Sequence, residues 1–268
     1  MNMRKKIIIL LGVFFLLGGA TAFYFYQKIY SNNVEKDGYL YVLGTSSYED
    51  VVALITPFVK NINSFQWVSQ KKNYPNHIKS GKYKIVKGMS NNQIINMLRS
   101  GKQEVVILSF NNQDSLEKLA GRISQQISAD SISLLKAFTD NDFLATHHFT
   151  KATALSMYIP NSYKFFWYTS AEKFRNRMLK EYRHFWNDTR KGKAERLQLK
   201  PQEISVLASI VQKETSFYKE QPKVAGLYLN RLRKGWALQS DPTVIYALQK
   251  EKKVTTPIKR VLTKYLEV

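Results

Sequence analysis

The sequence contains no cysteine, and this absence removes several classes of protein at once. Without a thiol among 268 residues, the chain has no disulfide framework, no thiolate zinc site, no catalytic cysteine and no lipid attached through an N-terminal cysteine. The absence does not indicate a compartment, because a chain without thiols is compatible with either side of a membrane.

The motifs of several common chemistries are missing as well. The histidines are His77, His147, His148 and His184. They do not form H-E-x-x-H, and the chain has neither G-x-S-x-G nor a P-loop. His147 and His148 would need distant carboxylates to bind a metal ion. We therefore expect no metal and no cofactor, and the sequence disfavours acyl-serine and nucleotide chemistry.

Acidic residues are scarce relative to basic ones. Twenty Asp and Glu stand against 41 Lys and Arg, which gives a net charge of +21. Such a charge attracts nucleic acid, acidic lipid or acidic wall polymer. No groove-reading or base-stacking module is recognisable, so we expect no nucleic-acid partner. A hydrophobic content of 44% with 13% aromatics excludes general disorder, and the length suits one large domain or two modest ones.

A long apolar run follows a short basic N-terminus. Residues 1–6 carry three positive charges, and residues 7–26 are twenty uncharged, mostly apolar residues ending in four aromatics. At about 1.5 Å per residue this run spans roughly 30 Å, the thickness of a bilayer core. Basic residues in front favour a cytoplasmic tail over 1–6, and the aromatics suit the outer headgroup level. We predict a single transmembrane anchor over 7–26, with the rest of the chain outside the cytoplasm.

Two alternatives to the anchor exist. Ala20-Thr21-Ala22 resembles a cleavage site, so the run could be a cleaved signal peptide, and a buried helix of a soluble protein is a second alternative. We prefer the anchor because the apolar run continues through four aromatics beyond that site.

The exported part has the pattern of an α+β protein. We expect a tether over 27–38 and a small α+β module over 39–110, with strands at 39–43, 81–86 and 103–110 and helices after Ser46-Ser47, over 64–71 and over 93–98. A larger mixed α/β domain follows over 111–268. Its expected helices cover 115–127, 131–138, 171–193 and 201–215, and 158–168 is a loop or short strand.

Charge and turn residues add detail to the larger domain. Ten Lys and Arg lie between Lys173 and Lys200, which we interpret as a solvated face rather than a polymer-binding one. Gly235 suits a helix end, and Asp241-Pro242 suits the N-cap and first residue of another helix.

The predicted helix 201–215 ends at a glutamate. Apolar residues at 204, 207, 208 and 211 form one stripe, and Glu214 extends it. We therefore expect Glu214 to be held partly out of water, which penalises the charged form of a carboxyl and suits a general acid. The alternative is that Glu214 frays into solvent at the helix end and pairs with a lysine.

Three motifs in order carry a family resemblance. These are ASIVQKET at 208–215, NRL at 230–232 and LQSDPTV at 238–244. Together they resemble the endolytic murein transglycosylase family, the MltG/YceG-like proteins. The resemblance runs over nearly the whole chain, including the anchor, IPNSY at 159–163, and IKSGKY at 78–83 with GMS at 88–90, a region that is LysM-like in the family.

The resemblance implies an activity and a location. It implies a peptidoglycan lytic transglycosylase that cuts nascent glycan strands between MurNAc and GlcNAc and leaves 1,6-anhydroMurNAc ends. The expected location is the inner (cytoplasmic) membrane of a bacterial cell, in a single pass. The expected partners are peptidoglycan glycan strands, the membrane and cell-wall synthases.

The resemblance also implies roles for individual residues. The family's catalytic acid/base is the glutamate before the threonine of the first motif, which is Glu214; many members have a second glutamate where this chain has Gln212. Around Glu214 we expect hydrogen-bonding groups for sugar from Asn230, Gln239 and Thr243, and apolar walls from Tyr163 and Tyr246. The alternatives are structural hydrogen bonds for Asn230 and Gln239 and core packing for Tyr246. Family members continue beyond the segment matching 259–267, so we expect the catalytic domain to be C-terminally shortened and incomplete.

One titrating group suffices for a lytic cut, whereas a hydrolase needs a second Asp or Glu about 5 to 9.5 Å away. Glu203 lies eleven residues from Glu214, about 16 Å along a helix, and is too far. Asp241 is an open candidate for a second carboxylate and for sugar binding, with helix capping as its alternative. The rival functions are a noncatalytic peptidoglycan-binding protein and a muramidase-like hydrolase.

Overall fold

The computed structural model describes residues 3–251, and these residues form a mixed α+β fold, as predicted. Twelve α-helices and two small antiparallel sheets lie in that range. The chain divides into two compact units. The first is Met1–Ala137 with Pro160–Phe174, and the second is Phe138–Ile159 with Arg175–Val268.

The first unit holds the N-terminal helix and both sheets. Its elements are α1 (Met3–Tyr30), β1 (Gly38–Val42), α2 (Tyr48–Ile55), α3 (Ile62–Lys71), β2 (Gly81–Ile85), α4 (Asn91–Ser100), β3 (Val105–Phe110), α5 (Leu116–Ser124) and β4 (Asn161–Phe166), with short 3-10 turns at Thr56–Phe58 and Tyr74–Asn76. Helix α6 (Ser131–Phe138) runs up to the boundary of the unit.

Helix α1 contains most of the predicted anchor. Its segment Leu10–Tyr30 is long and apolar enough to cross a membrane, by length and composition, and none of it is buried. The helix continues past residue 26, where the prediction ended the anchor, and stops at Tyr30.

Residues 31–38 differ from the predicted tether, because they pack into the module. Val34 is 2% exposed, and bridges pair it with Val59 and pair Asn32 with Ser90. The buried Asn33 donates from Nδ2 to Oδ1 of Asn91 at 2.7 Å. The polar composition that predicted a linker therefore serves a buried hydrogen-bond network.

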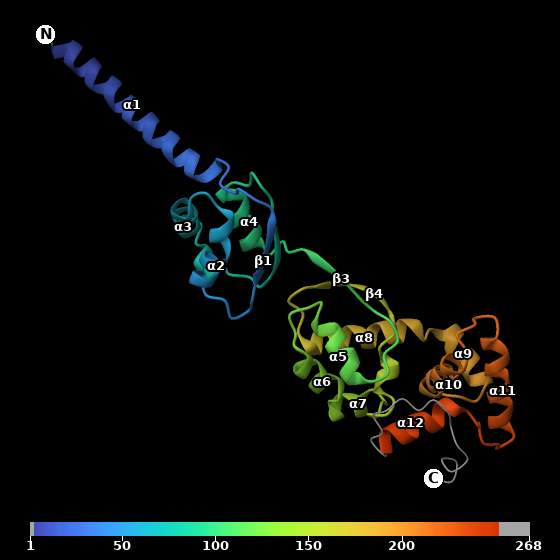
Figure 1. Ribbon diagram of the computed structural model, residues 1–268. Helices are drawn as coiled ribbons and strands as arrows, with labels where there is room; N and C mark the ends of the chain where they lie inside the picture. The colour runs from blue at the N-terminus through green and yellow to red at the C-terminus, as the bar shows by residue number, and fades with distance from the viewer. Residues whose placement is uncertain (1–2, 252–268) are drawn as a thin grey trace. The chain divides into compact units, whose positions relative to one another are not determined.

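The module is built on strands β1 and β2, which pair antiparallel with Gly38 opposite Ile85. Alternate residues of both strands enter the core, and α2, α3 and α4 gather beside β1 (Figure 1). Capping boxes at Ser47 and Ser90 start α2 and α4, and Gly101, at φ 73°, ends α4. The predicted strands and helices of this region are confirmed, with ends shifted by a few residues.

The second sheet pairs β3 with β4, and Val105 lies opposite Phe166. Residues 158–168 therefore contain a short strand, one of the two predicted options. Helix α5 packs on this sheet, and the Nε2 of Gln126 donates to the carbonyl of Ser109 at 3.0 Å.

The second unit is helical in its described residues. It contains α7 (Asn141–Thr146), a 3-10 turn (Ala154–Met157), most of α8 (Ala171–Phe185), α9 (Asp188–Arg196), α10 (Pro201–Glu214), α11 (Gln221–Arg233) and α12 (Asp241–Glu251). The prediction of one helix over 171–193 is wrong, because Asn187 caps a new helix by accepting a hydrogen bond from the backbone N–H of Arg190.

Helices α10 and α11 form the packed centre of the C-terminal part. Leu207 and Val211 of α10 and Tyr228 of α11 are buried together, and α9, α10 and α11 lie close to one another in Figure 1. Helix α12 also packs on α10. This packing brings the three resemblance motifs into one region of the second unit.

Candidate active site

Helix α10 positions Glu214 as its last residue. Pro201 occupies the first turn, and the side chain of Glu203 accepts a hydrogen bond from the backbone N–H of Lys200 at 2.7 Å. The helix ends because Thr215 is extended, at φ −142° and ψ 133°. Glu214 therefore projects from a helix end that Leu207 and Val211 hold in place.

The structure contradicts the expectation that Glu214 is sheltered from water, because Glu214 is exposed. Ala208, a member of the predicted apolar stripe, is exposed too, and only Leu207 and Val211 of that stripe are buried. The surface packed against α10 buries Leu207 and Val211 and does not reach the end of the helix.

Ser240 contacts the glutamate. Its Oγ donates a hydrogen bond to Oε2 of Glu214 at 3.1 Å, and Ser240 itself is only 1% exposed. The bond joins the end of α10 to the start of α12. A buried hydroxyl therefore restrains an exposed carboxylate.

Ser240, and not Asp241, caps α12. The carbonyl of Ser240 accepts hydrogen bonds from the backbone N–H of Thr243 at 3.0 Å and of Val244 at 3.4 Å, and the helix begins at Asp241. The prediction of Asp241 as N-cap is thus wrong by one position. Asp241 is an exposed residue of the first turn, next in sequence to the serine that contacts Glu214.

Arg231 fixes the loop between α11 and α12. Its guanidinium donates to the carbonyl of Leu238 and, at 3.0 Å, to Oε1 of Gln239. Gln239 has a left-handed backbone at φ 53°. Arg231 belongs to the NRL motif, and its position just before the turn at Gly235 was the sequence signal for a role in this loop.

The other predicted site residues divide between the two units. Thr243 donates from Oγ1 to the carbonyl of Ser240 at 2.7 Å, and Asn230 is an exposed residue of α11. Tyr246 is 58% exposed, which contradicts the alternative of core packing. Tyr163 lies in the first unit, on β4, where it is 7% exposed and stacks on Phe110 at 5.9 Å. Its role as a wall of the site stays a prediction.

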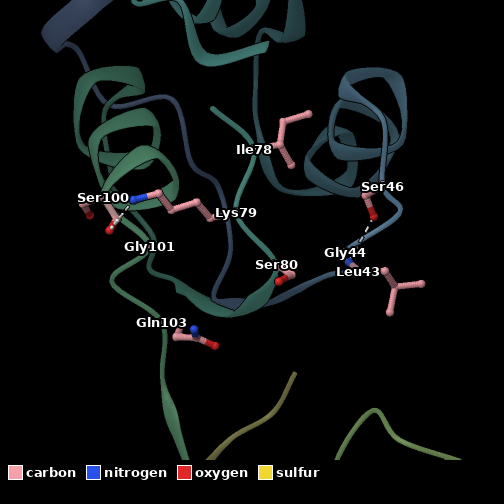
Figure 2. Close-up of a pocket in the computed structure, with 9 residues that line it drawn as sticks. All are labelled: Leu43, Gly44, Ser46, Ile78, Lys79, Ser80, Ser100, Gly101 and Gln103. Atoms are coloured by element: carbon pink, nitrogen blue, oxygen red, sulfur yellow. Dashed lines mark hydrogen bonds between the residues drawn. The ribbon is translucent and has the colours of Figure 1, made fainter. Parts of the chain in front are cut away.

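A polar cavity of about 390 Å³ lies in the first unit, within the module (Figure 2). It is lined by Leu43, Gly44, Ser46, Ile78, Lys79, Ser80, Ser100, Gly101 and Gln103. The Nζ of Lys79 donates to the carbonyl of Ser100 at 3.3 Å, and the backbone N–H of Leu43 donates to the hydroxyl of Ser46 at 3.0 Å. The IKSGKY motif therefore supplies one wall of this cavity.

A second concavity of about 560 Å³ lies beside the sheet of β3 and β4. Its lining includes Arg122 and the start of β4 at Asn161 and Ser162. The IPNSY motif thus contributes to a separate hollow of the first unit.

His147 and His148 belong to no group of potential metal ligands in the part of the chain that the structure describes. Among residues 3–251, no three His, Asp or Glu side chains are grouped so as to hold a metal ion. Burial, with the nearby guanidinium of Arg183, lowers the pKa of His147 below its usual range. The absence of metal and cofactor stays a prediction.

Three comparisons identify similar proteins. A model of the YceG-like family matches residues 41–265. A curated relative from Bacillus subtilis (strain 168), called endolytic murein transglycosylase, is 25% identical over 275 residues, which cover 94% of this chain and 73% of the relative. A crystal structure of a yceG-like protein from Listeria monocytogenes matches with a TM-score of 0.51 and 22% identity, over 87% of this chain and 80% of that chain. This structural match shows a similar fold.

Proposed function

This chain belongs to the YceG-like family, and we propose that it is a lytic transglycosylase that cleaves the glycan strands of murein. The proposal is supported by the Bacillus subtilis relative called endolytic murein transglycosylase. One observation carries it: the glutamate before the threonine of the first motif stands at a helix end with its carboxylate hydrogen-bonded to a buried hydroxyl. The expected products are strands that end in 1,6-anhydroMurNAc.

The proposed chemistry uses Glu214 twice. Its carboxylic acid first protonates the glycosidic oxygen between MurNAc and GlcNAc as the bond from that oxygen to the anomeric carbon breaks. The resulting carboxylate then removes the proton of the muramoyl 6-hydroxyl, whose oxygen bonds to the anomeric carbon. The proton given up is regained, and no water is consumed.

Ser240 and Arg231 act as positioning residues in this proposal. Ser240 restrains the carboxylate of Glu214 through its hydroxyl, and Arg231 holds the loop that leads to Ser240. Asn230, Gln239, Asp241, Thr243 and Tyr246 remain proposed contacts for sugar. Because Gln239 already accepts a hydrogen bond from Arg231 through its side-chain oxygen, its amide N–H groups are the part left to bind substrate.

The module and the anchor complete the proposal. We assign the small module as LysM-like, and its polar cavity as a place where a glycan chain contacts the protein. Helix α1 anchors the chain in the cytoplasmic membrane in a single pass, with the residues that follow α1 outside the cytoplasm. Cell-wall synthases are the proposed protein partners.

One observation favours the noncatalytic rival. Glu214 is exposed, which is less suited to a general acid than a sheltered site. A noncatalytic peptidoglycan-binding protein is therefore kept as a competing outcome. A muramidase-like hydrolase needs a general acid as well, and the products of the same experiment distinguish it.

The test is digestion of purified glycan strands by the full chain in detergent, with mass spectrometry of the products. The two products of a lytic cut together have the mass of the substrate, and one of them ends in an anhydro sugar. Hydrolysis adds one water and leaves a reducing end, which would identify the muramidase-like hydrolase. Binding without any cleavage would identify the noncatalytic protein.

Glu214→Gln is expected to abolish cleavage while the fold is retained, because the amide cannot donate and regain the proton. Glu203→Gln is the matched control, since it makes the same change at the other end of the same helix, where glutamine can also serve in the capping box. Full activity of Glu214→Gln would refute the assignment of Glu214.

A further inference from the structure

The end of α1 is packed onto the module. The ring of Phe25 stacks on Trp67 of α3, with centroids 5.0 Å apart and planes 15° from parallel. The Nδ2 of Asn91, at the start of α4, donates to the carbonyl of Lys28 at 2.9 Å, and Ile29 packs against the module core. The C-terminal end of α1 is therefore held against the module.

This packing fixes the position of α3 along the axis of α1. Phe25 lies within the candidate membrane span Leu10–Tyr30, about 7.5 Å before its end at the rise of an α-helix. Trp67 stacks on Phe25 and so lies at the same level. If α1 crosses a bilayer, this face of α3 reaches the layer where the span ends.

The chemistry of that face fits a lipid surface. Gln70 and Lys71 follow Trp67 by three and four residues, so they share its side of the helix, and both are exposed. The Nζ atoms of Lys28 and Lys71 lie 5.4 and 5.9 Å from the Trp67 ring centroid. Neither α1 nor α3 contains an acidic residue.

We propose that the α3 face, formed by Trp67, Gln70 and Lys71 together with Lys28, lies in the headgroup layer of an anionic phospholipid bilayer. Tryptophan prefers this layer, and lysine chains extend from it toward lipid phosphates. Each lysine near an anionic surface adds to the attraction. The inference rests on the membrane anchor of the proposed function and is independent of its catalytic part.

The absence of cysteine in the chain makes the test direct. Single cysteines are introduced for a nitroxide label as Gln70→Cys on the α3 face, Leu16→Cys within α1, and Lys102→Cys. Asn91, which contacts Lys28 of α1, begins α4, and Lys102 lies just past the other end of that helix. A ten-residue helix is about 15 Å long, so Lys102 is the label site far from α1. The full chain is reconstituted in vesicles of phosphatidylglycerol and phosphatidylcholine, and collisions of each label with oxygen and with a water-soluble nickel chelate are measured.

The expected result is a graded one. The Leu16 label collides mainly with oxygen, the Gln70 label shows an intermediate preference for oxygen, and the Lys102 label collides mainly with nickel. Lys71→Glu is expected to reduce the lipid-facing population of the Gln70 label by about fivefold or more. Lys102→Glu is the matched charge change and is expected to leave that population unchanged.

Three outcomes overturn the inference. A Gln70 label that collides mainly with nickel places α3 in water, and one shielded from both reagents places it against protein. A Lys102 label that prefers oxygen as strongly as the Gln70 label shows that the α3 face is not the surface that meets lipid. If the Leu16 label itself collides mainly with nickel, the proposed anchor fails as well, and this distinguishes the two failures.

Discussion

Ser240→Ala is expected to slow glycan cleavage by about two- to tenfold while leaving the second unit folded. The substitution removes the hydroxyl that donates to Glu214. It keeps the backbone carbonyl of residue 240, which accepts the first backbone hydrogen bonds of α12. Glu214 then loses the restraint that holds its carboxylate near one position.

The magnitude follows from the geometry of this bond. A hydrogen bond to a charged group contributes about 1.5 to 3 kcal/mol when water is excluded. Glu214 is exposed, so water replaces much of the lost interaction. The remaining energy, about 0.5 to 1.4 kcal/mol, is the cost of losing the preferred orientation of the carboxylate in the transition state. At about 1.36 kcal/mol per factor of ten, this gives a two- to tenfold lower kcat. KM should change little, because Ser240 is 1% exposed and has little surface with which to touch sugar.

The assay measures kcat and KM separately on glycan strands of defined length, together with the thermal unfolding temperature. Ser240→Thr keeps a hydroxyl and is expected to retain most of the rate. Ser209→Ala is the matched control, because it removes an exposed hydroxyl of α10 that donates to the carbonyl of Val206 at 2.6 Å. Wild-type kcat in Ser240→Ala, or an equal loss in Ser209→Ala, would refute the positioning role of Ser240.

Two further predictions concern the stability of the module. Asn33→Ala should lower the free energy of unfolding by about 2 to 3 kcal/mol, because it leaves the buried Asn91 amide oxygen and the backbone N–H of Asn61 without the bonds that Asn33 makes; the denaturant midpoint measures this, and the exposed Asn63→Ala should leave the midpoint unchanged. Burial raises the pKa of Tyr83 to about 12 and that of Tyr74 still further. Since these pKa values exceed the unfolded value of about 10, their contribution to stability is complete below about pH 10 and is lost as the pH rises toward 12. The free energy of unfolding measured by denaturant should therefore be lower at pH 11 than at pH 9. Tyr83→Phe should make this difference smaller, and an unchanged difference would contradict the prediction.

The module was predictable because its local signals agree with its packing. Ser47 and Ser90 stand at true helix starts, and Gly101 at a true helix end. Alternation along residues 39–43 predicted a strand, and Leu40 and Val42 are indeed buried within it. Where capping, periodicity and burial indicate the same element, the sequence suffices.

Long-range contacts explain what the sequence did not indicate. Residues 31–38 have the composition of a linker, and their burial depends on partners at Val59, Ser90 and Asn91. The break between α8 and α9 had a local signal, since Asn187-Asp188 is a capping pair, but basic residues on both sides of it suggested one continuous helix. Ser240 lies within the LQSDPTV motif, but nothing local indicated its contact with Glu214, because that partner lies 26 residues earlier in the chain.

Glu214 shows why the apolar periodicity of α10 gave a wrong environment for the end of the helix. An apolar stripe shelters Glu214 only if the surface packed against α10 extends as far as the helix does. Among the described residues, Tyr228 packs with Leu207 and Val211 in the centre of α10, whereas Glu214 at the end of the helix stays exposed. Periodicity fixes which side of a helix a residue occupies, and the length of the partner fixes whether that side is covered. Under the proposed function, the cover for Glu214 has to come in part from the glycan strand, so shortening the strand should reduce kcat and not merely raise KM.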